Sequence, residues 1–176
     1  MRLEPILHRD VPHLAPWIPA RVAAPASLPV LAKRLAGFEA DFAATRAWRF
    51  ALLDAAGDDL LGEIDLFPRN ASGRVALAEA DRAEVGYWLR SDRTGDGLAT
   101  EGVQAVISAA RELPQFAHLE IHCDARNTRS AALPSRLGFR LAPRDSRGTQ
   151  ASADASELQV WTLALGNESD RASSSS

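Results

Sequence analysis

Two glycines, Gly95 and Gly97, lie where the sequence changes from a strand pattern to a helix pattern. The strand pattern is EVGYWL, residues 84–89, and apolar residues at helical spacing begin after Gly97. Glycine readily takes positive φ angles, and a helix N-terminus presents free N–H groups and the positive end of the helix dipole. A tight turn alone could require both glycines, but the combination predicts an anion site, and we expect the anion to be a phosphate.

The segments that follow this turn narrow the kind of phosphate site. No Gly-Lys-Ser/Thr follows, which excludes a P-loop, and the turn lacks the GxGxxG pattern of dinucleotide-binding proteins. A second segment, NTRSAALPSRLGF at residues 127–139, comes one strand later. In this order the motifs resemble the GNAT superfamily of N-acetyltransferases. The resemblance extends over nearly the whole chain and is closest to the RimJ/RimL-type branch, which acetylates N-termini of ribosomal proteins, and to related small-amine enzymes.

The resemblance implies a site for the pyrophosphate of acetyl-CoA. The family turn reads Gln/Arg-x-x-Gly-x-Gly/Ala, and TGDGLA, residues 94–99, matches it with two departures. Thr94 replaces Gln or Arg, and Arg93 is the candidate for the missing cation. Asp96 adds an anion beside the phosphates, so its side chain is expected to point to water. The implied contacts are Arg93, Thr94, Gly95, Asp96, Gly97, Leu98, Ala99 and Thr100.

The family also implies where the rest of the coenzyme lies. Its strand equivalent to residues 84–90 splays from the next strand, here residues 118–123, and the pantetheine arm occupies the gap. Main-chain groups of Trp88, Leu89 and Arg90 would then pair with the arm, and one N–H would polarise the thioester carbonyl. Asn127 resembles the asparagine that contacts the arm, with an ordinary turn residue as the alternative.

A proton donor for the departing thiolate is less obvious. Many relatives use a tyrosine on the second helix, but the one tyrosine here, Tyr87, falls on the preceding strand. Ser130, three residues after Asn127, is the candidate replacement, with a helix N-cap as its alternative role. Pro134 lacks an N–H and therefore frees the carbonyl of Ser130, which could bend the helix or bind a ligand.

Three carboxylates are candidates for the base that deprotonates the amine. Glu84 shares a strand face with Trp88, and the family often has an acidic residue there. Glu63 and Asp65 share one face of a neighbouring strand, and a chain of water molecules is the remaining alternative.

The histidines and the cysteine are interpreted as structural. His118, Glu120 and His122 alternate along one strand face as a metal site could, but apolar residues between them favour a polar outer face. We therefore predict no metal. Cys123 has no indicated histidine partner, so a covalent acetyl-cysteine is not expected, although in some relatives a cysteine at this spacing lies near the coenzyme.

The remaining sequence supplies the elements that position these groups. We predict strands over residues 2–7, 48–53, 60–67, 84–90, 118–123, 157–165 and from Phe139, and helices over 31–44, 97–113 and 130–137. Residues 10–29 are expected to form short helical pieces, and 68–82 a long polar loop. The expected fold is α/β (α+β), an acyl-CoA N-acyltransferase (GNAT) fold with a mixed, mostly antiparallel sheet, a splayed strand pair and flanking helices. Residues 1–167 form the domain and 168–176 a disordered polar tail.

Composition limits the class of protein. The chain has 176 residues, 46% hydrophobic and 24% charged, which suits one small domain. A net charge of −3 argues against sequence-independent nucleic-acid binding. One cysteine excludes a disulfide framework, and neither a signal-peptide pattern nor an apolar run of membrane-spanning length occurs. We expect a cytoplasmic monomer or homodimer with no membrane or nucleic-acid partner.

The expected function is transfer of the acetyl group of acetyl-CoA to a primary amine by direct attack. The first candidate acceptor is a protein N-terminal amine of ribosomal-protein type. The alternatives are a small amine, such as a polyamine, an aminoglycoside or an amino-acid derivative, and a CoA-binding regulatory protein without catalysis. A deep acidic acceptor cleft would favour a polyamine, a wide shallow one a peptide, and a missing base the regulatory protein.

Overall fold

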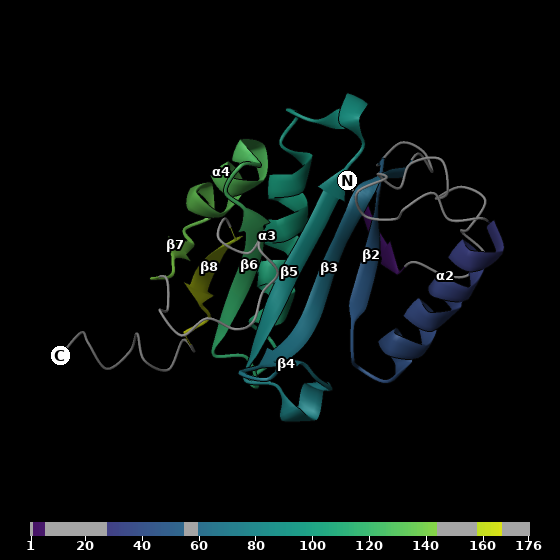
Figure 1. The fold of residues 1–176 in the computed structure, drawn as a ribbon, viewed down its shortest axis with the longest axis horizontal. Helices are drawn as coiled ribbons and strands as arrows, with labels where there is room; N and C mark the ends of the chain where they lie inside the picture. Colours follow the sequence, from purple (N-terminus) through teal and green to yellow (C-terminus); the bar gives the residue numbers. More distant parts are fainter. Residues whose placement is uncertain (1, 6–27, 55–59, 144–157, 167–176) are drawn as a thin grey trace.

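The computed structural model describes residues 2–5, 28–54, 60–143 and 158–166, and these form one mixed sheet with helices around it (Figure 1). The strands run in the order β1-β2-β3-β5-β6-β8-β7, and β4 pairs with β3. Neighbouring strands are antiparallel except β5 and β6, which are parallel. The predicted mixed, mostly antiparallel sheet is therefore confirmed. The strands are β1 (Arg2–Pro5), β2 (Trp48–Leu53), β3 (Leu60–Asn70), β4 (Gly73–Arg74), β5 (Arg82–Leu89), β6 (His118–Asp124), β7 (Arg140–Leu141) and β8 (Leu158–Ala164).

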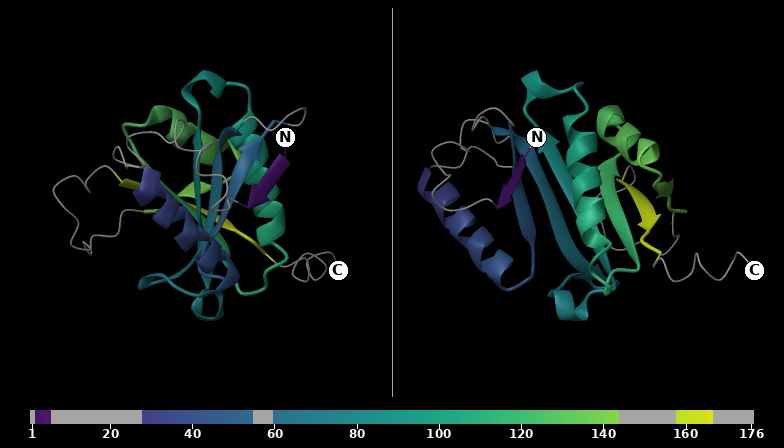
Figure 2. Two further views of the ribbon diagram at one scale, coloured as in Figure 1. Left: turned by 90° about the vertical axis from the view of Figure 1, so that its right-hand side faces the viewer. Right: turned by 180° about the vertical axis from the view of Figure 1, so that it is seen from behind.

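Helices lie on both sides of this sheet. Helix α3 (Leu98–Ala110) covers one face, and α2 (Leu28–Ala43) lies on the opposite side (Figure 2). Helix α4 (Thr128–Arg136) follows β6, and two short 3-10 helices, η2 (Leu77–Glu79) and η3 (Ser91–Arg93), precede and follow β5. Hereafter the sheet face opposite α3 is called the front face.

Helix α3 packs closely on the sheet because its apolar stripe includes a glycine. Val103, Val106 and Ile107 are buried in the core. A Cβ added to Gly102 would lie 2.9 Å from Cγ1 of Ile64 and 3.1 Å from Cδ1 of Leu52, so only glycine fits this contact without movement. The contact holds the N-terminus of α3 at a defined position beside β3 and β5.

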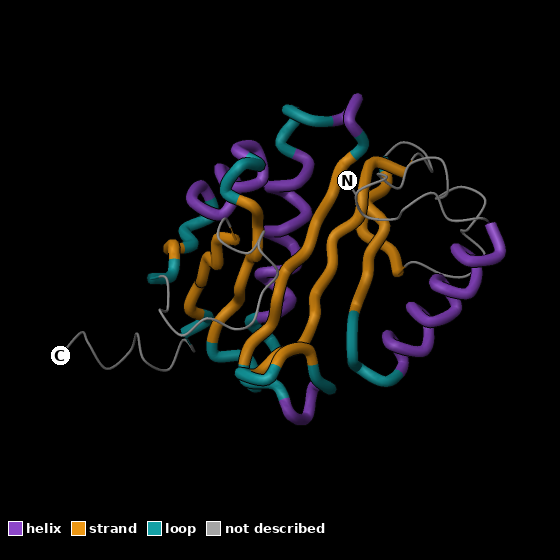
Figure 3. The backbone as a smooth tube through the Cα atoms, in the orientation of Figure 1, coloured by secondary structure: helices purple, strands orange, loops and turns teal. Residues whose placement is uncertain are grey.

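The segment predicted as a long polar loop is largely ordered structure, so that prediction is wrong. Strand β3 continues past Phe67 to Asn70, and Pro68 is buried opposite Ala83 of β5. The carbonyl of Pro68 accepts a hydrogen bond from the N–H of Val75, 3.1 Å away, after the chain turns back through β4. The proline interrupts the sequence pattern but not the pairing of the long strands β3 and β5, which run side by side in Figure 3.

The parallel pair β5 and β6 separates along its length, which confirms the predicted splay. Pairing covers Arg82↔His118, Ala83↔Leu119 and Glu84↔Glu120. Beyond Glu84, β5 remains paired with β3 up to Leu89, while β6 remains paired with β8. The sheet therefore opens between the two strands.

The other predicted elements differ from the structure mainly at their ends. Helix α2 begins at Leu28 instead of residue 31, and α4 begins at Thr128 instead of Ser130. The expectations for residues 6–27 and for the tail at 168–176 lie outside the described residues. In the described part of the chain, no helix combines the length and the apolar character needed to cross a membrane.

Candidate active site

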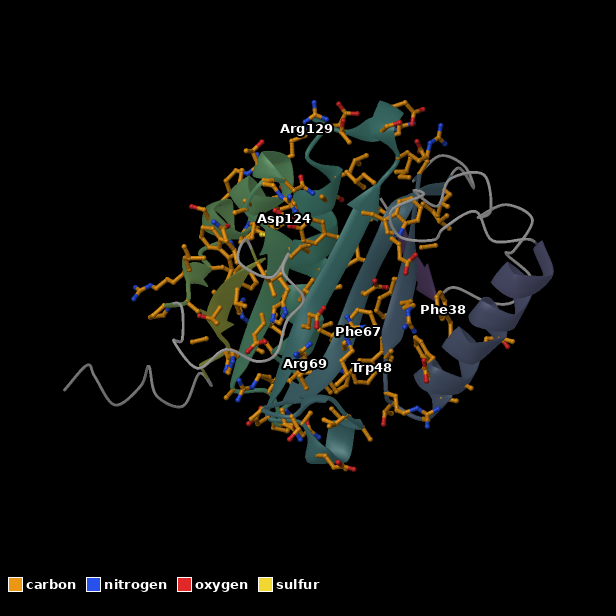
Figure 4. The ribbon with its side chains drawn as sticks, in the orientation of Figure 1. Phe38, Trp48, Phe67, Arg69, Asp124 and Arg129 are labelled. Carbon is orange, nitrogen blue, oxygen red and sulfur yellow. The ribbon has the colours of Figure 1, made fainter. Side chains whose placement is uncertain are left out.

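The gap between β5 and β6 opens into a cleft of about 1000 Å³, bounded by the turn before α3 and by α4. Figure 4 shows Asp124 and Arg129 at the end of β6 and the start of α4, where they line this cleft. Residues expected at the coenzyme that line it are Trp88, Leu89, Arg90, Thr94, Gly95, Gly97, Leu98, Ala99, Thr100, Asn127 and Ser130. Lining residues that the sequence did not single out for the coenzyme include Tyr87, His122, Asp124, Arg129, Leu133 and Arg136.

The glycine turn presents the N-terminus of α3 to the cleft. Gly95 and Gly97 have φ angles of 106° and 80°, and neither would meet another atom within 4 Å if it carried a Cβ. The backbone conformation, not crowding, is therefore the reason for glycine at both positions. The first helical N–H groups lack partners within a helix, and those of α3 come from residues that line the cleft. This arrangement suits an anion.

The cations near the turn differ from those expected. Arg93 does not line the cleft, and its Nη2 lies 3.6 Å from Oδ2 of Asp54. Arg129 and Arg136 of α4 line the cleft instead, so the second helix brings positive charge to the site. Asp96 is exposed and also does not line the cleft, as expected for a side chain that points to water. Arg93 was the expected cation because it adjoins the turn in the sequence. The α4 arginines are 30 or more residues from the turn, so the sequence did not indicate them.

The edge of β5 offers free main-chain groups to the cleft. The N–H of Arg90 donates to the carbonyl of Leu61 in β3 at 2.9 Å. Successive residues of a strand direct their N–H and C=O groups to opposite sides. Those of Leu89 therefore face the gap, where they can pair with an extended ligand or donate to a carbonyl oxygen.

Ser130 and Tyr87 form a pair across the cleft. The Ser130 hydroxyl donates to Oη of Tyr87 at 3.1 Å, and the Tyr87 hydroxyl donates to the backbone carbonyl of Ser130 at 2.9 Å. That carbonyl can accept because Pro134, four residues later, has no N–H to offer it. Burial raises the pKa of Tyr87, so the phenol is protonated at neutral pH. In the sequence, Pro134 indicated that the Ser130 carbonyl lacks its helical donor. The sequence did not indicate that Tyr87 contacts this carbonyl, because Tyr87 lies on a strand and not on the second helix.

The alternative role of Ser130 as a helix cap is wrong. Helix α4 begins at Thr128, and its N-cap is Asn127, whose Oδ1 accepts the N–H of Ser130 at 3.3 Å. Ser130 is the third residue of the helix, because the helix includes Thr128 and Arg129. The Ser130 hydroxyl is thus available to Tyr87 and to the cleft.

Glu84 is held in an ion pair away from the cleft lining. Its carboxylate accepts from Nη1 of Arg69 and, at 2.7 Å, from Nη2 of Arg74. Burial would raise the pKa of Glu84, but the hydrogen bond and charge of Arg74 outweigh it and hold the pKa below its ordinary value. Figure 4 shows Arg69 on the front face of the sheet. A carboxylate stabilised in its charged form by two arginines is a weak base.

The other two carboxylate candidates lie next to each other on β3. Oε2 of Glu63 accepts the indole N–H of Trp88 at 3.0 Å, in a buried position. Burial, followed by the charge of Glu63 and a hydrogen bond with it, raises the pKa of Asp65 well above its ordinary value. The Asp65 carboxyl lies over Gly86 of β5, where an added Cβ would be 3.1 Å from Oδ2. Neither carboxylate lines the cleft.

Glu120 lies at the centre of a row of polar groups on β6. Its carboxylate contacts Nε2 of His122 at 2.9 Å, Nε2 of His118 at 3.3 Å and Nη1 of Arg82 at 3.3 Å. The hydrogen bond from His122, opposed by burial and reinforced by His118 and Arg82, lowers the pKa of Glu120 to about 2. Of the two histidines, His122 lines the cleft and His118 does not.

The splayed strands, the glycine turn and the cleft together define an acyl-CoA N-acyltransferase fold. Residues 1–140 match the family model described as an acetyltransferase (GNAT) domain, so the chain belongs to this family. A protein of Bacillus subtilis (strain 168), YdaF, named as a ribosomal N-acetyltransferase, is 30% identical over 78 residues, which are 42% of this chain and 43% of that protein. The match thus spans less than half the length of this relative.

Solved structures share the fold at lower identity. A RimL ribosomal L7/L12 alpha-N-protein acetyltransferase, in complex with coenzyme A joined by a disulfide to one of its cysteines, superposes with a TM-score of 0.75 at 16% identity, covering 92% of each chain. A chimera of the spermidine N-acetyltransferase SpeG from Vibrio cholerae and hSSAT superposes with a TM-score of 0.71 at 14% identity, covering 93% of this chain and 95% of that one. At these identities the likeness shows the fold alone.

Proposed function

We propose that this chain transfers the acetyl group of acetyl-CoA to the N-terminal amine of a protein of ribosomal type. The observation that carries this proposal is the cleft between β5 and β6, which ends at the N-terminus of α3. A reactive thioester would be supplied by acetyl-CoA, and the protein needs to hold it, polarise its carbonyl and protonate the departing sulfur.

The residues of the cleft fit the coenzyme. The N–H groups of Leu98, Ala99 and Thr100 would hold the pyrophosphate, and Arg129 and Arg136 would add positive charge. The N–H of Leu89 would donate to the thioester carbonyl. Each of these groups is polar and belongs to a residue that lines the cleft.

Ser130 and Tyr87 are the candidates for stabilising the departing sulfur. Their hydroxyls are 3.1 Å apart, and both residues line the cleft. The Tyr87 hydrogen bond to the Ser130 carbonyl orients the pair, so a hydroxyl proton can pass from either residue to a thiolate in the gap. Ser130 keeps its proposed role, with Tyr87 as its partner.

The charges on the front face favour a peptide over a polyamine as acceptor. Glu84 pairs with Arg69 and Arg74, and Glu120 pairs with Arg82, while Glu63 and Asp65 contact each other and lie outside the cleft lining. A polyamine site needs a surplus of unpaired carboxylates to bind several positive charges. The names of YdaF and RimL also point to ribosomal proteins, whereas SpeG is named for spermidine. We further propose a cytoplasmic location, because a single cysteine suits a reducing compartment.

Two measurements test the proposal. CoA affinity is measured by calorimetry in Gly97→Ala and in Gly138→Ala, which has a similar φ angle of 83°, equally open surroundings and a position outside the cleft. Positive φ should cost each variant about 1 kcal/mol of stability, but only the Gly97 variant should bind CoA more weakly. Equal CoA affinities in the two folded variants would contradict this site.

Turnover is followed by thiol release from acetyl-CoA. We expect release with peptides that begin with Ser or Ala and none with the same peptides acetylated at the N-terminus. Release with spermidine and not with peptides would show a small-amine enzyme. CoA binding without turnover of any amine would show a regulatory protein.

A further inference from the structure

Among the described residues of β6, His122 and Asp124 are the titratable groups that lie on the front face and line the cleft, and Asp124 is paired with Arg126, whose Nη2 lies 2.7 Å from its Oδ2. Pairing of β5 with β6 ends at Glu84↔Glu120, and His122 lies two residues beyond it, where the strands have separated. Alternation along β6 places His122 on the same face as Glu120, and its side chain is 21% exposed. It lines the cleft together with Trp88 and Leu89, beside the strand edge where the thioester carbonyl would lie.

The surroundings of His122 determine which of its ring nitrogens is free. Nε2 lies 2.9 Å from Oε2 of Glu120, whose side chain is only 9% exposed. Because the pKa of Glu120 is about 2, this carboxylate is ionised at neutral pH and can only accept a hydrogen bond. In the neutral imidazole Nε2 therefore carries the proton, and Nδ1 carries the lone pair.

We propose that His122 is the general base that deprotonates the acceptor amine through Nδ1, with Glu120 as the residue that positions its ring. The inference rests on the proposed function and adds a residue to it. Glu120 is in turn held by Arg82 at 3.3 Å and by Arg69 at 3.9 Å, so the carboxylate cannot readily turn away from the imidazole.

The proton balance of the step is complete with these groups. Nδ1 takes one proton from the acceptor ammonium and passes it to solvent, which leaves a neutral amine. The nitrogen lone pair then forms the C–N bond to the acetyl carbon while the C–S bond breaks. The second proton lost by nitrogen balances the proton taken up by the CoA thiolate, and the products are an amide and a thiol.

The other titratable groups near His122 are less suited to this role. Glu84, the facing charge on β5, is bound by two arginines, and despite its burial the hydrogen bond and charge of Arg74 hold its pKa below its ordinary value. His118 contacts the same carboxylate, Glu120, but lies outside the cleft. That difference makes His118 a matched control.

The test compares His122→Gln with His118→Gln, since each variant removes one imidazole from Glu120. Thiol release is measured from pH 6 to 10 at saturating acetyl-CoA with a peptide acceptor, and melting temperature and CoA affinity are measured in parallel. We expect His122→Gln to lower kcat at pH 7 by up to about tenfold, because about a tenth of an α-amino group with a pKa of about 7.7–8.0 is already neutral at that pH. The loss should shrink above pH 8, where a free α-amino group of pKa about 7.7–8.0 is already neutral.

Further variants separate catalysis from structure. His118→Gln should leave kcat within about threefold, and both variants should keep the CoA affinity of the unaltered chain. Glu120→Gln should lower kcat without weakening CoA binding, because the carboxylate that orients the His122 ring is lost. With a weakly basic acceptor, whose amine is neutral at pH 7, His122→Gln should lower kcat less than with the peptide acceptor.

Each outcome decides between the two proposals. An unchanged pH–rate profile in folded His122→Gln, or an equal loss in His118→Gln, would overturn the assignment of the base while leaving the acetyltransferase intact. If the unaltered chain binds CoA but releases no thiol with any amine, the proposed function fails, and the base assignment fails with it.

Discussion

The contact between Tyr87 and Ser130 leads to a quantitative prediction. Tyr87→Phe removes the hydroxyl that donates to the Ser130 carbonyl at 2.9 Å. Pro134 cannot donate in its place, so the carbonyl is left without this partner in a part-buried position. A buried polar group without a partner costs about 1–3 kcal/mol. For a domain of this size, about 2 kcal/mol corresponds to a melting temperature lower by roughly 4–8 °C.

A double-mutant cycle with Pro134→Ala isolates the cause. Alanine at position 134 restores an N–H at the place in α4 where it can donate to the Ser130 carbonyl. The Tyr87→Phe substitution should then cost less in the Pro134→Ala background than in the unaltered chain. We expect a coupling of about 1 kcal/mol, because contacting residues commonly couple by 0.5–3 kcal/mol.

The assay is urea denaturation of the four proteins, followed by circular dichroism, with CoA affinity measured as a check on the cleft. Pro134 is fully buried, so Pro134→Ala alone changes stability through packing as well, and the cycle cancels that contribution. Additivity of the two substitutions within about 0.3 kcal/mol would refute the account in which proline frees the carbonyl for tyrosine.

Three further predictions concern the sheet and its charges. Gly62→Ala would place a Cβ 2.1 Å from the carbonyl oxygen of Trp88, so the edge of β5 must move. We expect the free energy of unfolding to fall by about 3 kcal/mol or more and CoA binding to weaken. A stable variant with normal CoA affinity would contradict this. The pKa of Glu120 is lowered from 4.5 to about 2, so its stabilising contribution is present above pH 4.5 and is lost as the pH falls toward 2. In an acid titration, the stability of Glu120→Gln should therefore fall less steeply with pH than that of the unaltered chain. Parallel curves of stability against pH would argue against the ion-pair network. Glu84→Gln should destabilise the protein by about 1–3 kcal/mol, because Arg69 and Arg74 lose their charged partner. The pH–rate profile should change little. A profile shifted as in His122→Gln would show that Glu84 is the base.

Much of the fold and the glycine turn before α3 could be predicted from the sequence, because they depend on local properties. Gly95 and Gly97 supply the backbone torsions of a tight turn, and the period of apolar residues distinguishes the strands from α3. The missing N–H of Pro134 likewise marks a free carbonyl without any knowledge of its partner. These features are properties of the chain within a few residues.

The identity of the groups that meet in the cleft depends on the tertiary structure. Glu84 shares a strand face with Trp88, as predicted, yet the β3–β4 hairpin brings Arg69 and Arg74 onto its carboxylate. His122 lines the cleft and His118 does not, because the parallel pairing of β5 and β6 ends between them. Charge pairing and exposure are set by strand register and by the point where two strands separate. Both are contacts between residues distant in sequence, so no local pattern encodes them.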